Sequence, residues 1–341
     1  MLNDRIKYID IAKGITIILV VMFHSHVKSF FPNITAAVFI FLMPLFFFLS
    51  GVFFSTRLDF FSFVVKKVDS LLKPYIIVGI VVIVLYCVIG NYSKDFMLGL
   101  LYGNGGTLIW VPMWFLTHLF LISCFSYFLF QIPIFEKSTG INAFIIFIAL
   151  FIFGYILFTY INSHFPEDFE SFKDVGLPFS LDLLCMTTSY FILGRMTRNS
   201  VLVFRPHMAI TVLFLIAFIL LNIYYEPQMD FNERVFHNIP IALVCSLMGI
   251  YLTLVVSFYV SKLRLVAMLF AYVGQSSLYI LIFHFAVVAK SYPQLEKYLG
   301  NCLPDVLLAF ISLTIGVIVP LVLKQLIESN KFSKYLFKPV S

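Results

Sequence analysis

The sequence carries little charge. Only 12% of its 341 residues are Asp, Glu, Lys or Arg, whereas charged residues make up about 25% of an average soluble domain. No stretch of about 100 residues, the usual size of a domain, is polar enough to form a separate soluble domain. This scarcity excludes an ordinary soluble protein. The net charge of +6 follows a membrane pattern and does not indicate a nucleic-acid partner.

Cysteine is sparse as well. There are five, an odd number, and they form no CxxC pair. All but Cys302 lie in apolar runs, where a free cysteine usually serves as a small buried side chain. We therefore expect neither a disulfide framework nor a metal site.

Apolar residues, by contrast, make up 61% of the chain and gather into runs long enough to cross a bilayer. The basic start MLNDRIK is not followed by a small-residue cleavage site, so the first run is expected to stay as an uncleaved helix. We predict an all-α polytopic membrane protein with about ten spans, near residues 9–28, 35–55, 74–90, 111–131, 142–161, 179–194, 208–224, 237–259, 266–289 and 305–327.

The basic residues predict how these spans are oriented. Of the 23 Lys and Arg residues, six fall on one set of loops and span ends: Lys28, Lys94, Lys173, Arg234, Lys290 and Lys297. The remainder fall on the opposite set. Cytoplasmic loops carry the excess of positive charge, so both termini are expected in the cytoplasm. The acidic loops 164–174 and 226–234 are then exported.

The first apolar run, residues 9–27, holds ionisable groups at membrane depth. Its uninterrupted apolar part, residues 14–23, spans only about 15 Å as a helix, half of a hydrocarbon core of about 30 Å. Lys13 and His24 are separated by eleven residues and project from one helix face, with Asp10 one turn before Lys13. Charged groups inside a membrane are costly and usually functional. This face is therefore predicted to carry a site, whereas His26 points away from it.

Two later spans contain further candidates. Trp114 and His118 share a helix face at a spacing of four residues, and Tyr279 and His284 lie in the ninth predicted span. A tryptophan at a membrane interface is commonly an anchor. A histidine within a span is either part of a polar pocket or held by a neighbouring helix. The sequence leaves both alternatives open for His118 and His284.

Basic residues also gather at the predicted cytoplasmic surface. The amphipathic stretch 57–75 carries Lys66, Lys67 and Lys73, while Arg195 and Arg198 close the sixth span. Such clusters bind lipid headgroups. They are equally suited to an anionic cytoplasmic ligand.

Several of these patterns together resemble the acyltransferase type 3 family. They are DIAKGITIILVVMFH, MPLFFFLSG, KPY, WFL, LGR and SLYILIFH, and they follow the family's order from residue 10 to residue 284. The first is the most specific, because the family's basic residue and histidine, ten residues between them, fall on Lys13 and His24. The family more often has Arg at the first position. The region WFLTH lacks the acidic residue that many members carry in their fourth span.

The resemblance implies transfer of an acyl group, usually acetyl from cytoplasmic acetyl-CoA, to a sugar hydroxyl of a surface polysaccharide or its lipid-linked precursor. The branch it is closest to contains fucose 4-O-acetylase-like proteins of the bacterial cytoplasmic membrane. His24 would be the general base, supported by the Lys13–Asp10 pair three turns below it, and Lys13 or Tyr279 would stabilise the negative charge on the thioester oxygen. Lys66, Lys67, Lys73, Arg195 and Arg198 would hold CoA, and Trp114, His118, Tyr279 and His284 would face the acceptor. A single membrane domain over residues 1–341, without an appended soluble domain, is expected.

Two other classes of protein share some of these features. A transporter or flippase for a lipid-linked glycan also places charges inside the membrane, but it commonly contains an internal repeat with broken helices, and none is evident here. A polysaccharide polymerase would favour a basic exported loop, whereas the large predicted exported loops are acidic.

Overall fold

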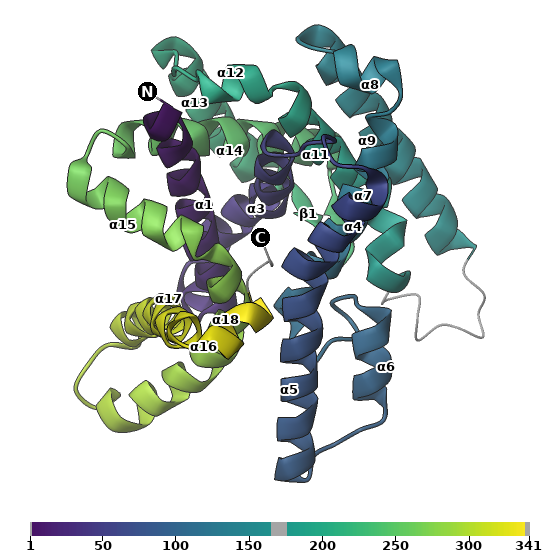
Figure 1. The fold of residues 1–341 in the computed structure, drawn as a ribbon. Helices are drawn as coiled ribbons and strands as arrows, with labels where there is room; N and C mark the ends of the chain where they lie inside the picture. The colour runs from purple at the N-terminus through teal and green to yellow at the C-terminus, as the bar shows by residue number, and fades with distance from the viewer. Residues whose placement is uncertain (1, 165–175, 338–341) are drawn as a thin grey trace. The chain divides into compact units, whose positions relative to one another are not determined.

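The structure, a computed structural model, describes residues 2–164 and 176–337, with side chains from residue 7 onward (Figure 1). Most of these residues are helical. The chain forms two compact units: unit 1 is Met1–Phe46, Leu202–Asp230 and Val235–Leu326, and unit 2 is Phe47–Val201, Phe231–Arg234 and Ile327–Ser341. Because segments of the two units alternate, they are not successive domains, and the single domain over residues 1–341 stays a prediction.

Unit 1 contains the N-terminal helix and most of the C-terminal half of the chain. Its elements are α1 (Leu2–His24), α2 (Val27–Phe30), the first part of α3 (Pro32–Val52), α13 (Met208–Tyr225), β1 (Gln228–Asp230), β2 (Val235–His237), α14 (Ile239–Val260), α15 (Arg264–Gln275), α16 (Ser277–Leu299) and most of α17 (Asp305–Ser329).

Helix α1 packs most extensively against α15, and Figure 1 shows the two helices alongside each other. Two glycines permit this approach. A Cβ atom on Gly14 would lie 2.1 Å from the carbonyl oxygen of Phe270, and one on Gly274 would lie 1.8 Å from that of Asp10. Since both obstacles are backbone atoms, no side-chain movement could relieve the clash. The small residues thus fix the position of α1.

The predicted span 266–289 is wrong as a single helix, because the chain breaks at Ser276 between α15 and α16. Ser276 has φ −101° and ψ 6°, outside the helical range. Its buried hydroxyl donates to the Tyr272 carbonyl and accepts from the Lys324 ammonium at 2.7 Å. Both bonds hold the Ser276 side chain at the break, where the Ser276 backbone N–H also donates to the Tyr272 carbonyl at 3.1 Å.

Unit 2 contains the middle of the chain. Its elements are the end of α3, α4 (Phe60–Lys67), a π-helical turn (Val68–Leu72), α5 (Lys73–Ile89), α6 (Asp95–Tyr102), a 3₁₀ turn (Val111–Met113), α7 (Trp114–Leu129), α8 (Pro133–Lys137), α9 (Ile141–Ser163), a second 3₁₀ turn (Pro178–Leu183), α11 (Leu184–Met196), most of α12 (Arg198–Leu202) and α18 (Lys331–Phe337).

The amphipathic stretch predicted over residues 57–75 is helical from Phe60 onward and is continuous with α5. Asp59 begins α4 by accepting the Ser62 backbone N–H at 3.0 Å, as N-cap residues do. Helix α4 then passes through the π turn into α5, which ends at Gly90 with φ +83°. Glycine is favoured there because the left-handed conformation has no steric cost without a Cβ. The helix therefore runs well past residue 75, and the binding of lipid headgroups or an anionic ligand by this stretch stays a prediction.

The β hairpin was not predicted. Strands β1 and β2 are antiparallel, with Met229 opposite Phe236. The turn between them, residues 231–234, belongs to unit 2 and carries Arg234 in a left-handed conformation (φ 56°). This turn places a charged side chain within a buried site of unit 2.

Within the two described ranges, eight helices are long and apolar enough to cross a membrane. The helical, multi-pass architecture is thereby confirmed, whereas the count of ten spans and the cytoplasmic termini stay predictions. The predicted span 179–194 contains a 3₁₀ turn and the thirteen-residue α11, which is shorter than the usual span of about twenty residues. Of the two acidic loops, residues 165–175 lie outside the described residues.

Candidate functional site

His24 is the last residue of α1 and belongs to unit 1. Its ring is half-buried between two aromatic side chains. Phe23 and Phe285 both present a T-shaped contact, with ring centroids 5.4 Å and 5.6 Å from that of His24. These two rings flank the imidazole, which stays partly exposed.

His284 of α16 faces His24, with a distance of 5.2 Å between ring centroids and an interplanar angle of 53°. It is completely buried. Its Nδ1 lies 2.7 Å from the Ile280 carbonyl oxygen and 3.0 Å from that of Leu281, whereas its Nε2 has no hydrogen-bond partner among the described residues. The sequence predicted both histidines but not their proximity.

Asp10 and Lys13 occupy the preceding turns of α1, also in unit 1. The Asp10 carboxylate accepts a hydrogen bond from Gln275 Nε2 at 2.9 Å and acts electrostatically on the half-buried Lys13 ammonium. The ion pair of Asp10 with Lys13 stays a prediction, and the structure adds an amide from α15 as a partner of Asp10. Gln275 was not predicted, because an exposed glutamine at the end of an apolar run carries no distinctive signal.

Lys324 was also missed as a site residue. Its ammonium donates to Ser276 and lies 4.7 Å from the Tyr272 ring centroid. The only signal in the sequence is a lone lysine near the end of the apolar run of α17. Tyr279 is buried one turn beyond Ser276 on α16, in the same unit as His24.

His118 and Trp114 belong to α7 in unit 2. Both are buried, with ring centroids 5.7 Å apart. His118 Nδ1 lies 2.9 Å from the Phe179 carbonyl oxygen, and Nε2 lies 2.9 Å from Thr187 Oγ1. Since the carbonyl can only accept, Nδ1 carries the proton. Nε2 shares the Thr187 hydroxyl with the backbone carbonyl of Leu183, which lies 3.0 Å from the same oxygen. Both ring nitrogens are thus occupied, and contact of His118 with a substrate stays a prediction.

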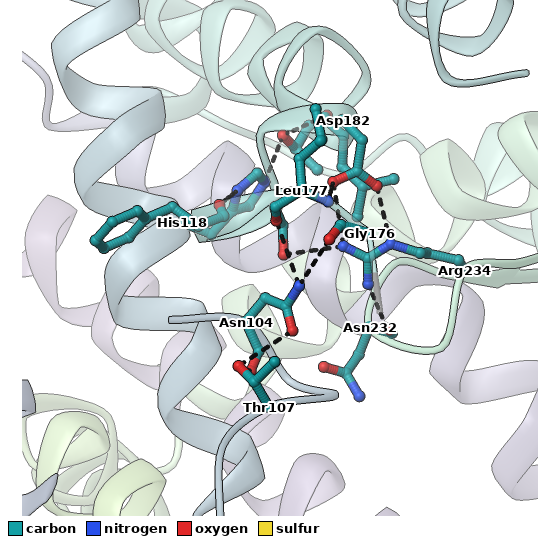
Figure 2. Close-up of polar contacts among 12 residues, drawn as sticks. Asn104, Thr107, His118, Gly176, Leu177, Asp182, Asn232 and Arg234 are labelled. Carbon is teal, nitrogen blue, oxygen red and sulfur yellow. Dashed lines mark hydrogen bonds and ion pairs between the residues drawn. The ribbon is translucent and has the colours of Figure 1, made fainter. Parts of the chain in front are cut away.

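His118 holds a strained segment in place. Phe179 and Ser180 both have positive φ, 54° and 56°, a conformation that costs a non-glycine residue about 1–2 kcal/mol. The Phe179 carbonyl lies against His118, and Arg234, which pairs with Asp182, donates from Nη2 to Ser180 Oγ at 3.4 Å. Figure 2 shows His118, Asp182 and Arg234. Polar side chains therefore secure both residues of the strained segment.

Asp182 and Arg234 form an almost completely buried ion pair, with their side chains 2% and 4% exposed. Arg234 Nε donates to Asp182 Oδ2 at 2.8 Å and Nη2 donates to Oδ1 at 3.2 Å. Asp182 also accepts the Leu177 backbone N–H at 2.9 Å. A Cβ on Gly176 would lie 2.1 Å from Arg234 Nε, so only glycine fits beside this pair.

The glycine-rich loop at residues 102–107 reaches the same cluster. Tyr102 donates to the Gly176 carbonyl at 2.7 Å, and Asn104 Nδ2 donates to the Leu177 carbonyl at 3.3 Å (Figure 2). Burial, followed by the charge of Asp182, raises the pKa of Tyr102. The loop is therefore a structural connection within unit 2.

The predicted cationic residues all belong to unit 2. Lys66 is exposed, Lys67 is half-buried with its ammonium 5.5 Å from the Phe63 ring centroid, and Lys73 pairs with Asp69. Arg195 is half-buried, with its guanidinium 5.9 Å from the Phe130 ring centroid, and Arg198 begins α12.

Unit 2 also contains an open cavity of about 1010 Å³ beside α5 and α6. Its described lining holds one carboxylate, Asp95, and no histidine or lysine: Tyr86, Asp95, Phe96, Leu98, Gly99, Leu101, Tyr102, Gly106, Thr107, Leu108, Ile109 and Pro178. The cavity therefore lacks an imidazole base. No group of three or more His, Cys, Asp or Glu suited to a metal ion occurs within residues 2–164 and 176–337.

The chain matches the model of one protein family. The family is acyltransferase 3, described as an acyltransferase domain, and the match covers residues 6–324. It includes α1 with Lys13 and His24 as well as α16 with His284. No curated protein and no solved structure matches the chain.

Proposed function

We propose that this chain, which belongs to the acyltransferase 3 family, moves an acetyl group from cytoplasmic acetyl-CoA to a sugar hydroxyl. The acceptor is a surface polysaccharide or its lipid-linked precursor, and the location is the bacterial cytoplasmic membrane. Family membership and the apolar helices make the protein a membrane acyltransferase. The donor, the acceptor and the type of membrane are the finer part of the proposal.

The observation that carries the mechanism is the position of His24. A sugar hydroxyl is a weak nucleophile, and an imidazole can remove its proton near neutral pH. His24 is half-buried between Phe23 and Phe285, which keeps water away while leaving an edge for a substrate. We assign His24 as the general base. The hydroxyl oxygen then attacks the thioester carbonyl, the C–S bond breaks, and the thiolate of CoA recovers the proton.

Lys13 supports a different part of the donor. Eleven residues of helix separate it from His24, a rise of about 16 Å, so its ammonium cannot touch the carbonyl that reacts at His24. An extended pantetheine arm covers a separation of this kind. We therefore assign Lys13, with Asp10 beside it, to the remote portion of acetyl-CoA. Tyr279 is the proposed donor of a hydrogen bond to the oxyanion.

The basic residues of unit 2 are the proposed contacts of the CoA phosphates. Their proposed role is to form charge-assisted hydrogen bonds with phosphate, and Lys73 would do so while paired with Asp69. The set is Lys66, Lys67, Lys73, Arg195 and Arg198. Neutralising Lys66, Lys67, Arg195 or Arg198 should raise the KM for acetyl-CoA, and added salt should do the same. If all four single variants keep the wild-type KM, the phosphates bind elsewhere. Trp114 and His118 are retained as proposed contacts of the acceptor.

The test measures donor consumption and product together. Membranes containing the protein are supplied with acetyl-labelled acetyl-CoA, and both released CoA and label in the purified glycan are quantified. Matched increases in the two quantities, absent without the protein, support the proposal. A flippase or polymerase would move or extend the glycan without releasing CoA. If the acetyl label is found in the lipid part of the glycan precursor and not on its sugars, the proposed acceptor is wrong.

A further inference from the structure

We infer that His284 is a positioning residue for His24. Nε2 of His284 accepts a hydrogen bond from one ring nitrogen of His24, and the other ring nitrogen of His24 takes the proton of the sugar hydroxyl. The inference rests on the proposed function, because it gives a role in the same reaction to a second histidine of unit 1. It depends on three observations: the fixed tautomer of His284, its burial and its distance from His24.

Backbone atoms determine the tautomer of His284. The two groups near Nδ1, the carbonyls of Ile280 and Leu281, can only accept hydrogen bonds. Nδ1 therefore carries the proton, and the lone pair of the neutral ring is on Nε2. The same carbonyls would stabilise a positive charge on the ring. A histidine held in this way is an acceptor oriented by a third group, as in other proton-transfer sites.

The lone pair on Nε2 lacks a donor. His284 is completely buried, and Nε2 has no partner among the described residues. A buried acceptor without a hydrogen bond is unfavourable and unusual in a folded protein. His118 shows the ordinary arrangement in the same chain, since both of its ring nitrogens have protein partners. Packing alone therefore does not explain why Nε2 of His284 has no hydrogen-bond partner among the described residues.

His24 is the group able to supply the missing donor. With 5.2 Å between their centroids and a 53° tilt, the two rings can bring facing nitrogens to hydrogen-bond distance through a small rotation. His24 is half-buried and His284 fully buried, so an incoming acceptor meets His24 first. The proposed hydrogen-bond chain therefore runs from the sugar hydroxyl to His24, then to His284, and then to the backbone carbonyls of Ile280 and Leu281.

Every proton that moves in this series of reaction steps is accounted for. The hydroxyl proton moves to one nitrogen of His24 as the O–C bond forms, and the N–H on the other nitrogen strengthens its bond to His284 Nε2. When the C–S bond breaks, His24 returns a proton to the thiolate. The ammonium of Lys28, 4.1 Å from the Phe23 ring centroid, is the nearby charged side chain on the adjoining element. The hydrogen bond accepted by neutral His284 would favour the imidazolium that forms on His24.

The experiment compares His284→Leu with His284→Gln in the full-length protein. Leucine fills the site without an acceptor, while the glutamine amide oxygen can still accept from His24. The rate of glycan acetylation is measured from labelled acetyl-CoA in native membranes over a range of pH, at matched membrane abundance. We expect His284→Leu to lose about 10²-fold in kcat with little change in KM for acetyl-CoA. His284→Gln should recover part of that rate.

The pH profile separates positioning from packing. Without an acceptor, the imidazolium of His24 is less stable, so the acid limb of kcat/KM should move to lower pH in His284→Leu and return in His284→Gln. Thermal stability should not fall in His284→Leu, because it removes a buried polar atom. A wild-type rate in His284→Leu, or equal losses in both variants with an unmoved limb, would overturn the inference. An active His24→Ala enzyme would instead overturn the base assignment in the proposed function.

Discussion

Gly14 and Gly274 meet backbone to backbone where α1 packs on α15: a Cβ on Gly14 would stand 3.2 Å from the Gly274 backbone nitrogen. This contact fixes the distance of α1 from α15 and the rotation of α1, the helix that carries Lys13 and His24. The site therefore depends on two residues that have no side chains.

Substituting Gly274 with alanine should displace α1. The added methyl group would lie 1.8 Å from the Asp10 carbonyl oxygen, and overpacking of this kind costs about 1–3 kcal/mol. We expect a lower melting temperature and a larger loss of acetylation than that loss of stability alone produces. Gly79→Ala is the matched control, because the nearest atoms to its methyl group belong to the movable Leu100 side chain. Equal effects of the two variants would contradict the prediction.

His24→Ala should reduce glycan acetylation by about 10²–10⁴-fold, the usual effect of removing a general base. His26→Ala provides the comparison. His26 is exposed and stacks on Tyr292 with 3.7 Å between ring centroids, so its loss should affect the rate only slightly. Both variants are assayed at equal membrane abundance. A His24→Ala enzyme with near-normal activity would redirect attention to His284 and His118.

Arg234→Ala should destabilise unit 2, because it leaves the Asp182 carboxylate buried without its cation. Breaking a buried ion pair from one side costs about 3–5 kcal/mol. The exposed Arg205, replaced in the same way, should change stability by less than about 0.5 kcal/mol. Replacing Asp182 and Arg234 together by apolar residues of similar size should cost less than Arg234→Ala. Thermal unfolding in detergent measures all three.

Stability should also depend on the proton of Tyr102. Burial and Asp182 raise the pKa of its hydroxyl, which donates to the Gly176 carbonyl. The contribution of the protonated Tyr102 to the free energy of unfolding is complete below the ordinary tyrosine pKa of about 10. It is lost as the pH rises through the raised pKa of the folded state. The melting temperature of the wild type should therefore fall more steeply at alkaline pH than that of Tyr102→Phe. Tyr224→Phe, an exposed substitution, should follow the wild type.

The sequence predicted those features that follow from local patterns. Apolar runs located most spans, and the helical repeat placed Lys13 and His24 on one face. Motif order led to the family that the match over residues 6–324 supports. Each of these depends on residues within one helix, so a single sequence is sufficient.

Features that depend on distant contacts were not predicted. The break at Ser276 is stabilised by Lys324, 48 residues later, and Asp10 is bonded to Gln275, 265 residues later. The β turn at Arg234 is held by Asp182. A hydropathy profile cannot detect such pairs, because it averages over residues that are neighbours in the sequence. The proximity of His24 and His284 was missed for the same reason.

The π turn at Val68–Leu72 has a consequence for the length of the chain. A π turn accommodates an extra residue within a helix, and each residue rotates the helix by about 100°. Deleting one residue there would restore a regular α-helix but turn α4 by roughly a quarter circle relative to α5. Lys66 and Lys67 would then point in a different direction from Lys73. Relatives that keep this basic face are thus expected to tolerate substitutions in the turn more readily than deletions.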